Sequence, residues 1–104
     1  MIMERVLRHV VLFGFKDEAK AEQIAEAEAA FSTLPEQIDV IKDFEWGTDV
    51  SVENNAKGFS HCFFVTFADE AGRDTYLPHP AHQAFVAVVQ NVLKQSLVID
   101  YWAS

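Results

Sequence analysis

Residues 7–15 read LRHVVLFGF, and this run of β-branched and aromatic residues decides the fold. Polar residues hardly interrupt the run, which is typical of a β-strand that is covered on both faces. Residues 59–67, FSHCFFVTF, have the same nearly continuous apolar character. We therefore predict two strands in one sheet, with protein packed against each face of that sheet.

Two further strands are indicated around the second run. Residues 40–50, VIKDFEWGTDV, place aromatic and β-branched residues at alternating positions. Residues 97–102, LVIDYW, form the last apolar run, and the polar stretch 51–58, SVENNAKG, is typical of a loop. These segments bring the expected number of strands to four.

Helical spacing marks the region between the first two strands. Residues 18–34 are rich in Ala and Glu, and their apolar residues recur along one helix face. Asp17 is a candidate N-cap for this helix, since acidic residues favour the first turn. We expect Pro35 to end the helix, because proline lacks the N–H that a helix interior needs.

A second helical region follows the 59–67 strand and is broken in two. Asp69 is expected to cap a short helix that ends near Tyr76 and Leu77. The Pro78-His79-Pro80 segment then interrupts the chain. A further helix is expected from about residue 80 to residue 95, with proline in its first turn.

The predicted order of elements is β-α-β-β-α-β, with the second helix split. This order is the ferredoxin-like plan of the α+β class, a four-stranded antiparallel sheet with helices on one face. The apolar strands require cover on the other face as well, and a second sheet packed against it would supply that cover. We therefore expect one domain over residues 1–104 and a homodimer.

The composition restricts the partners of the chain. Its formal net charge is −8, from 16 acidic and 8 basic residues. The basic residues are scattered rather than clustered, so we expect neither a nucleic-acid partner nor an anionic membrane surface. No apolar stretch approaches the ~20 residues of a membrane helix. The start of the chain does not resemble a signal peptide, and Cys62 is the only cysteine, so we expect a cytoplasmic protein.

Three histidines and one tyrosine occupy positions that favour a proton-handling pocket. His9 and His61 lie within the two apolar strands, and Tyr76 and His82 flank the proline break. Each residue also has a structural alternative. His82 could cap its helix or bind a backbone carbonyl, and Tyr76 could be a core residue with a satisfied hydroxyl. His9 and His61 could form a hydrogen-bonded pair across adjacent strands.

The sequence favours no metal or cofactor site. His79 lies between two prolines and is expected to serve the turn or to cap the helix. His79 and His82 are three residues apart, but no further ligands complete a metal site, and no feature favours haem. Cys62 and His61 are adjacent in a strand and so face opposite sides of the sheet, which disfavours a nucleophilic Cys-His pair.

Four segments together resemble the stress-responsive A/B barrel family, often called Dabb. They read HVVLF (residues 9–13), FEWGTDV (44–50), KGFSH (57–61) and YLPHPAH (76–82). The resemblance extends over nearly the whole chain, and Tyr-x-x-His-Pro-x-His is its most specific part. It implies a ferredoxin-like subunit and a dimeric α+β barrel.

One plant branch of this family, similar to the olivetolic acid cyclase type, closes a linear polyketide by an intramolecular aldol reaction without a cofactor. The resemblance implies that Tyr76 and His82 are catalytic, with His82 as the base and Tyr76 as the donor to the carbonyl oxygen. The residues that it places around the pocket are His9, His61, Phe63, Leu77 and Phe85. Phe63, Leu77, Pro78 and Phe85 depart from that branch and imply a pocket of different shape.

Two classes of function follow from the resemblance. The first is a pocket protein that carries out cyclase-like or other proton-transfer chemistry on a polyketide-like or other carbonyl substrate. The second is a non-catalytic dimeric scaffold or accessory protein of the stress response. Loss of binding or turnover in Tyr76→Phe or His82→Ala, at an unchanged melting temperature, would favour the first class.

Overall fold

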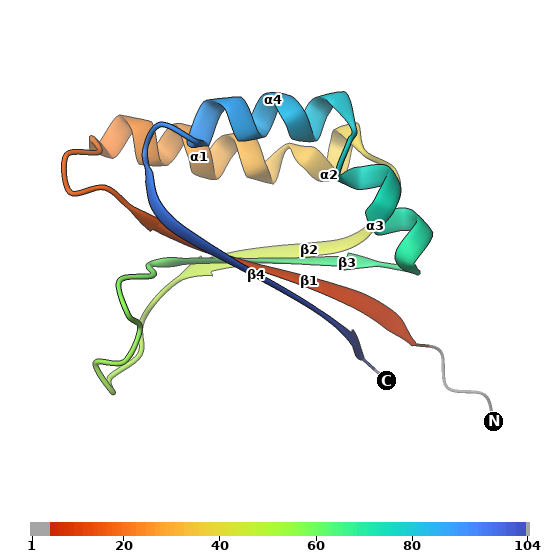
Figure 1. The fold of residues 1–104 in the computed structure, drawn as a ribbon, viewed down its shortest axis with the longest axis horizontal. Helices are drawn as coiled ribbons and strands as arrows, with labels where there is room; N and C mark the ends of the chain where they lie inside the picture. Colours follow the sequence, from red (N-terminus) through yellow and green to blue (C-terminus); the bar gives the residue numbers. More distant parts are fainter. Residues whose placement is uncertain (1–4, 104) are drawn as a thin grey trace.

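A computed structural model describes residues 5–103 and contains a four-stranded antiparallel sheet with helices against one face (Figure 1). The elements are β1 (Val6–Phe15), α1 (Ala21–Ser32), α2 (Leu34–Gln37), β2 (Ile41–Thr48), β3 (His61–Phe67), α3 (Glu70–Tyr76), α4 (Pro80–Val89) and β4 (Leu93–Ala103). The strands are ordered β2-β3-β1-β4 in the sheet. This is the ferredoxin-like α+β fold that the sequence predicts, with its second helix divided into α3 and α4.

β1 lies between β3 and β4, and its register decides which side chains share a face. His9 of β1 is opposite Val65 of β3 and opposite Asp100 of β4. Side chains alternate along a strand, and residues directly opposite one another point to the same side of the sheet. His9, Val65 and Asp100 therefore all face the helical layer.

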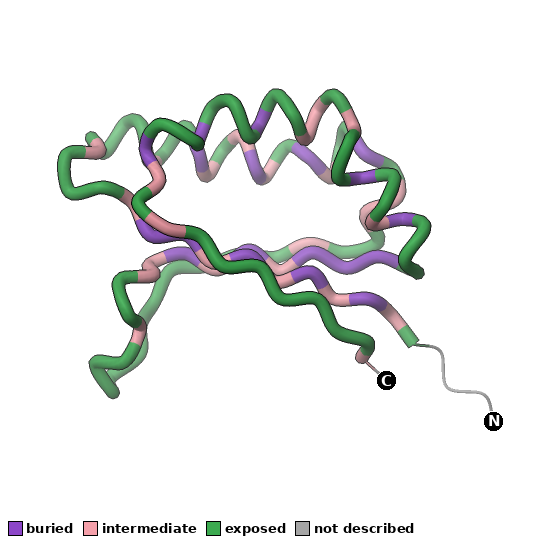
Figure 2. Tube along the Cα trace, in the orientation of Figure 1, coloured by how far each residue is buried: buried purple, intermediate pink, exposed green. Residues whose placement is uncertain are grey.

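Aromatic rings fill much of the space between the sheet and the helices. Phe31 of α1 stacks on Phe63 of β3, with the ring centroids 4.2 Å apart. The ring centroids of Phe13 and Phe85 lie 6.2 Å and 4.6 Å from that of Phe31. Figure 2 shows the buried stretches on the central strands and on the helices above them. Because each aromatic ring removes about 150–250 Å² from water, this cluster contributes substantially to the hydrophobic stabilisation of the subunit.

The first helical region begins and ends differently from the prediction. α1 begins at Ala21, and its N-cap is Lys20 rather than Asp17. The backbone N–H of Lys20 donates to the side chain of Gln23 at 2.8 Å, so the helix start is closed by residues later than Asp17. Pro35 does not end α1; it lies in the first turn of the short helix α2, where its missing N–H costs no hydrogen bond.

The later elements also have boundaries that the sequence misplaced. α4 ends at Val89 rather than at residue 95, because the chain turns there and the N–H of Val92 donates to the carbonyl of Val89. β4 consequently begins at Leu93, four residues earlier than expected. Asp69 does cap α3 as predicted, since its side chain accepts a hydrogen bond from the N–H of Gly72.

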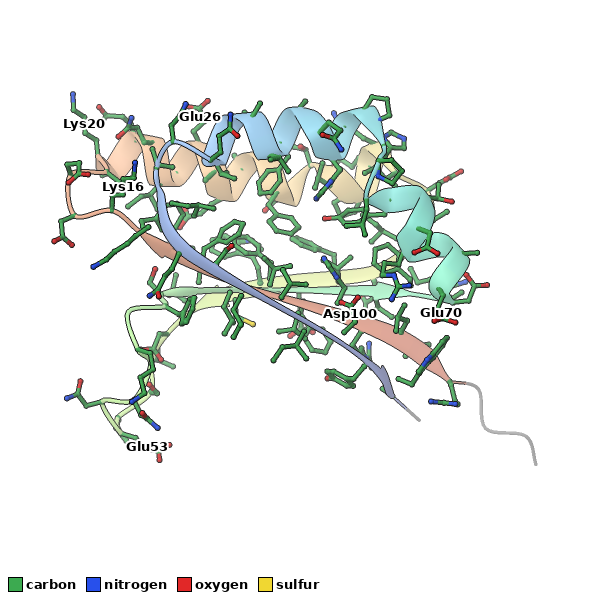
Figure 3. All side chains as sticks on the ribbon, in the orientation of Figure 1. Lys16, Lys20, Glu26, Glu53, Glu70 and Asp100 are labelled. Carbon is green, nitrogen blue, oxygen red and sulfur yellow. The ribbon has the colours of Figure 1, made fainter. Side chains whose placement is uncertain are left out.

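The sheet face opposite the helices carries exposed apolar side chains. Leu97, Ile99 and Tyr101 of β4 share this outer face and are 42%, 54% and 44% exposed. Arg8 of β1 lies among them, opposite Tyr101 in the β1–β4 register, and its guanidinium lies over the ring of Phe64. On the other side of the sheet, Lys20 and Glu26 project from the helical layer (Figure 3). Within residues 5–103, no helix has the length and apolar character needed to span a bilayer.

Candidate functional site

A cavity of about 330 Å³ lies between the sheet and α4 and collects most of the polar rings noted in the sequence. Its volume falls within the range of about 300–1,000 Å³ that is usual for small-molecule sites. The side chains around it are His9, Val11, Phe13, Phe31, Tyr76, Leu77, His82, Phe85, Val86, Val89, Gln90, Leu93, Ser96, Val98 and Asp100. The walls are mainly apolar, so the few polar groups are the candidates for chemistry.

His82 is held in one tautomer by the broken helix. It lies in the first turn of α4, and its Nδ1 is 2.8 Å from the carbonyl oxygen of Leu77. A carbonyl can only accept, so Nδ1 carries the proton and Nε2 of the neutral ring keeps a free lone pair. Burial lowers the pKa of His82, the Leu77 carbonyl opposes this, and the nearby His9 lowers the pKa further. His82 is therefore available as a neutral base at neutral pH.

Tyr76 supplies a hydroxyl beside this base. It is the last residue of α3 and only 1% exposed, and its ring centroid lies 4.5 Å from that of His82. No hydrogen bond from its hydroxyl is recorded within residues 5–103, yet no fully buried side-chain oxygen in this part of the chain lacks a partner. The hydroxyl must therefore reach the open space of the cavity. Burial raises the pKa of Tyr76, so the hydroxyl stays protonated and can donate.

His9 is oriented by two charged residues. Its Nδ1 is 2.6 Å from a carboxylate oxygen of Asp100, and the other oxygen of Asp100 accepts a hydrogen bond from Arg73 at 3.3 Å. The carboxylate can only accept, so Nδ1 of His9 is the donor and Nε2 is directed away from Asp100. The His9 ring packs edge-on against Tyr76 with centroids 5.7 Å apart. Figure 3 marks Asp100 on β4.

Asp100 is a candidate site residue that was not predicted from the sequence; it lines the cavity and bonds His9. It is the single charged residue within the apolar run 97–102, and an acid in such a run is a signal for a buried partner. Arg73 gave no comparable signal, because arginine is ordinary on the exposed side of a short helix.

Leu77 and Phe85 complete the cavity in different ways. Leu77 is 40% exposed, so it lies at the opening, whereas Phe85 is 5% exposed and belongs to the wall. His79 lies outside the lining and caps α4, because its Nδ1 accepts a hydrogen bond from the N–H of Ala81 at 3.0 Å. This is the capping role that the sequence predicts for His79.

The structure places His61 and Phe63 outside the cavity. His61 is opposite Phe13 in the β1–β3 register, four residues along β1 from His9, so the two histidines do not pair. His61 bonds Glu28 of α1 at 2.7 Å and the hydroxyl of Ser60 at 2.7 Å. Phe63 instead packs beneath Phe31 in the aromatic core. The antiparallel register separates these residues from the cavity, although all of them lie in apolar strands.

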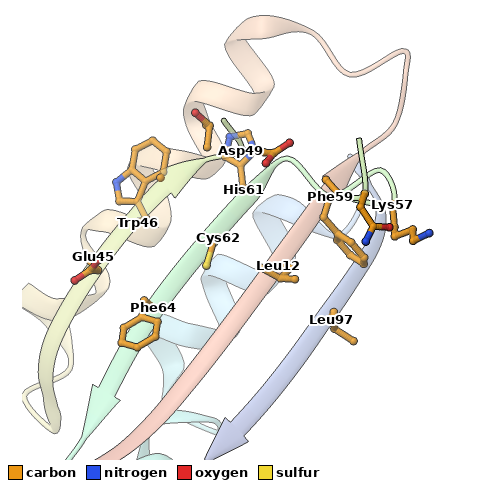
Figure 4. A pocket seen from close by; sticks show the side chains of 14 residues that line it. Leu12, Glu45, Trp46, Asp49, Lys57, Phe59, His61, Cys62, Phe64 and Leu97 are labelled. Carbon is orange, nitrogen blue, oxygen red and sulfur yellow. The ribbon is translucent and has the colours of Figure 1, made fainter. Parts of the chain in front are cut away.

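A larger hollow of about 610 Å³ lies at the end of the sheet where β2 ends and β3 begins (Figure 4). Leu12, Cys62, Phe64 and Leu97 line it, together with the chain that follows β2. Burial raises the pKa of Cys62, followed by the charge of Glu45, so its thiol stays protonated rather than becoming a nucleophile. His61 also lines this hollow, but both of its ring nitrogens are already bonded, to Ser60 and to Glu28, so it offers no free lone pair to a ligand. The smaller cavity, where His82 keeps such a lone pair, is therefore the candidate site.

The arrangement in the cavity suits acid–base chemistry on a neutral molecule. It combines a base with a free lone pair, a protonated hydroxyl and a second, oriented imidazole. Within residues 5–103, no three His, Cys, Asp or Glu side chains come together in a way that could hold a metal ion.

Comparison with known families and proteins gives consistent results. The model of the Stress responsive A/B Barrel Domain matches residues 7–103. The stress-response A/B barrel domain-containing protein HS1 of Arabidopsis thaliana is 39% identical over 95 residues, which are 91% of this chain and 87% of that protein. Olivetolic acid cyclase of Cannabis sativa is 33% identical over 95 residues, which are 91% of this chain and 94% of the cyclase.

Solved structures of the same fold include an enzyme and a dimer. Hydroxynitrile lyase from Passiflora edulis is 25% identical with a TM-score of 0.91, and the match covers 98% of this chain and 96% of the lyase. A dimeric ferredoxin-like protein from Jannaschia is 26% identical with a TM-score of 0.80, and the match covers 92% of this chain and 97% of that chain.

Proposed function

The chain belongs to the stress responsive A/B barrel domain family, and from this premise we propose that its cavity binds a small carbonyl compound and transfers protons on it. One observation carries the proposal: a histidine with a free lone pair and a tyrosine whose hydroxyl has no recorded partner within residues 5–103 face one mainly apolar cavity. His82 is the proposed base and Tyr76 the proposed donor.

The proposed reaction begins at the carbon beside the carbonyl group. Nε2 of His82 removes a proton from that carbon, and the electrons of the C–H bond move to form the enolate. The hydroxyl of Tyr76 donates a hydrogen bond to the enolate oxygen, where negative charge develops. Return of the proton from His82 to the substrate restores both residues.

A substrate with a second carbonyl group could cyclise by the same proton transfers. The enolate carbon attacks the second carbonyl carbon, a C–C bond forms, and the proton passes from His82 to the new alkoxide oxygen. His9, fixed by Asp100, is placed to orient that second carbonyl. His61 and Phe63 would contribute only indirectly, through the packing of the end of the sheet and of Phe31.

The relatives support this class of chemistry without naming a substrate. One is a cyclase and another a hydroxynitrile lyase. Formation of a ring from a polyketone and cleavage of a cyanohydrin both require a proton to be moved near a carbonyl carbon. A base and a donor that face one mainly apolar cavity would serve either reaction.

We also propose that the chain acts as a homodimer through the outer face of its sheet. Leu97, Ile99 and Tyr101 are exposed in the single subunit, and large exposed apolar patches usually mark an interface. The dimeric protein from Jannaschia, which has the same fold, supports this proposal. The cavity lies on the opposite side of the sheet, so such a dimer would leave the proposed site within each subunit.

Exchange of ketone α-protons for deuterium, followed by NMR, tests the proposal directly because it needs no knowledge of the product. A series of straight-chain methyl ketones serves as the probe. His82→Gln should lower the exchange rate by about 10²–10⁴-fold, the usual contribution of a general base. His79→Asn is the matched control, since His79 is a nearby histidine outside the cavity and asparagine can still cap the helix.

The outcomes separate the two classes of function. Equal exchange rates in the His82 and His79 variants would show that His82 is not the base. A folded protein that neither binds ketones nor accelerates exchange would favour the non-catalytic scaffold.

A further inference from the structure

The cavity is elongated, and its two long walls run side by side. On β4, the cavity is lined by Ser96, Val98 and Asp100, which are alternate residues and so share the inward face. The distance along the strand from residue 96 to residue 100 is roughly 13 Å, at about 3.3 Å per residue. On α4 and just beyond it, the lining extends from His82 to Gln90. This helix span is roughly 12 Å at 1.5 Å per residue, so both walls have the same length.

The proposed reacting groups occupy only one end of these walls. α4 runs back toward the start of β4, so His82 lies near Asp100 and Gln90 lies near Ser96. The middle of the cavity is apolar and includes Val89 and Val98. An alkyl or aromatic segment would suit this middle part.

The far end carries hydrogen-bonding groups that the protein does not use. Ser96 and Gln90 both line the cavity, and the part of the chain that the structure describes offers no recorded side-chain hydrogen bond to either. A hydroxyl and an amide together can donate and accept. Neither is charged, and no Lys or Arg lines the cavity. The one lining carboxylate, Asp100, is already paired with His9 and Arg73.

We propose that Ser96 and Gln90 form a recognition site for an uncharged hydroxyl or carbonyl oxygen at the far end of an elongated substrate, whose reacting carbonyl lies at His82 and Tyr76. The inference rests on the proposed function and narrows its substrate class. It selects neutral molecules with two polar groups separated by an apolar segment. Anionic tails are disfavoured, because no Lys or Arg is among the residues that line the cavity and the chain carries a net charge of −8.

Binding of paired ketones tests this site. The probes are straight-chain methyl ketones of increasing length, each with either a terminal hydroxyl or a terminal methyl group, and affinity is measured by calorimetry. At one matched length, the hydroxyl form should bind about threefold to tenfold more tightly, the usual net value of one hydrogen bond in a partly exposed site.

Two variants and one control locate the effect. Ser96→Val and Gln90→Leu should each reduce or remove the preference for the hydroxyl form, while the methyl form keeps its affinity within about twofold. The methyl form thus reports that the variant is folded and its cavity intact. Asn91→Leu is the control, because Asn91 is adjacent to Gln90 but does not line the cavity, and it should retain the preference.

The results distinguish failure of this site from failure of the proposed function. Ketones that bind without any preference for the hydroxyl form would overturn the recognition site alone. A preference that persists unchanged in both variants would also overturn it. If no ketone of either series binds, the carbonyl-binding function fails and the recognition site fails with it.

Discussion

Replacement of Tyr76 by phenylalanine should lower the activity of the protein while leaving its stability unchanged or slightly raised. The substitution removes one oxygen and leaves the ring, which is 1% exposed and packs against His9, Phe67 and His82. A hydroxyl with a protein partner would contribute about 0.5–1.5 kcal/mol to folding. The Tyr76 hydroxyl has no recorded partner within the described residues, so its removal should leave the free energy of unfolding unchanged or raise it by up to about 1 kcal/mol.

The effect on catalysis should be much larger and of the opposite sign. A donor aimed at a developing oxyanion is worth about 10²–10³-fold in rate, or about 2.7–4 kcal/mol. We therefore expect the Tyr76→Phe variant to exchange ketone α-protons about 10²–10³-fold more slowly than the unmodified protein. The pKa of Tyr76 is raised by burial, so the hydroxyl is protonated over the whole neutral range and the loss should not vary with pH there.

Urea denaturation and NMR-detected exchange on the same samples provide the two measurements. Tyr101→Phe is the matched control, because Tyr101 lies on the outer face of β4 and is 44% exposed. The Tyr101→Phe variant should change neither the free energy of unfolding nor the exchange rate. A Tyr76→Phe protein that loses more than about 1 kcal/mol of stability but exchanges at the normal rate would refute the reasoning and make the hydroxyl a structural group.

Three further predictions concern other parts of the site and of the fold. Burial lowers the pKa of His82, so the acid limb of the ketone exchange rate should lie below the ordinary histidine pKa of about 6.5, and a flat pH profile would contradict this. The folded state favours the neutral form of His82. The stability that depends on this neutral form is therefore complete above the ordinary pKa and is lost as the pH falls through the lower folded-state pKa. Asp100→Asn should cost about 1.5 kcal/mol in urea denaturation, because His9 loses a charge-assisted hydrogen bond, and unchanged stability would argue against the pair. Leu97→Asp should weaken self-association in sedimentation while the melting temperature of the subunit is retained, since Leu97 is 42% exposed in it; a dimer that forms as before would move the interface elsewhere.

The strands were predictable because their chemistry is local. The runs at 7–15 and 59–67 are apolar on both faces, and only a strand between two layers accommodates such a run. The pairing register of the strands could not be predicted from these runs, because a run without alternation does not reveal which residue of one strand lies opposite which residue of the next. His9 and His61 therefore looked equivalent in the sequence, whereas the antiparallel pairing of β1 with β3 places them four positions apart.

Helix ends were harder to predict than helix positions because tertiary contacts decide them. The apolar pattern continues beyond Val89, but Leu93 is needed opposite Phe15 on β1, and the chain leaves the helix to reach it. Asp100 was overlooked for a similar reason. Its importance depends on its position opposite His9 across two strands that are distant in sequence, and no local pattern contains that information.

The proline break is what brings together His82 and Tyr76, the proposed base and donor. In a continuous helix, Tyr76 and His82 would be six residues apart, at about 9 Å along the axis and about 240° around it, so they would not share a face. The break turns the chain between α3 and α4 and brings their rings within 4.5 Å. It also changes the partner of Leu77: a continuous helix would give its carbonyl to the N–H of Ala81, but that N–H bonds His79 instead. The freed carbonyl accepts from Nδ1 of His82, and this bond leaves Nε2 with the free lone pair that the proposed base requires. The two prolines thus determine both where His82 lies and which of its nitrogens keeps a free lone pair.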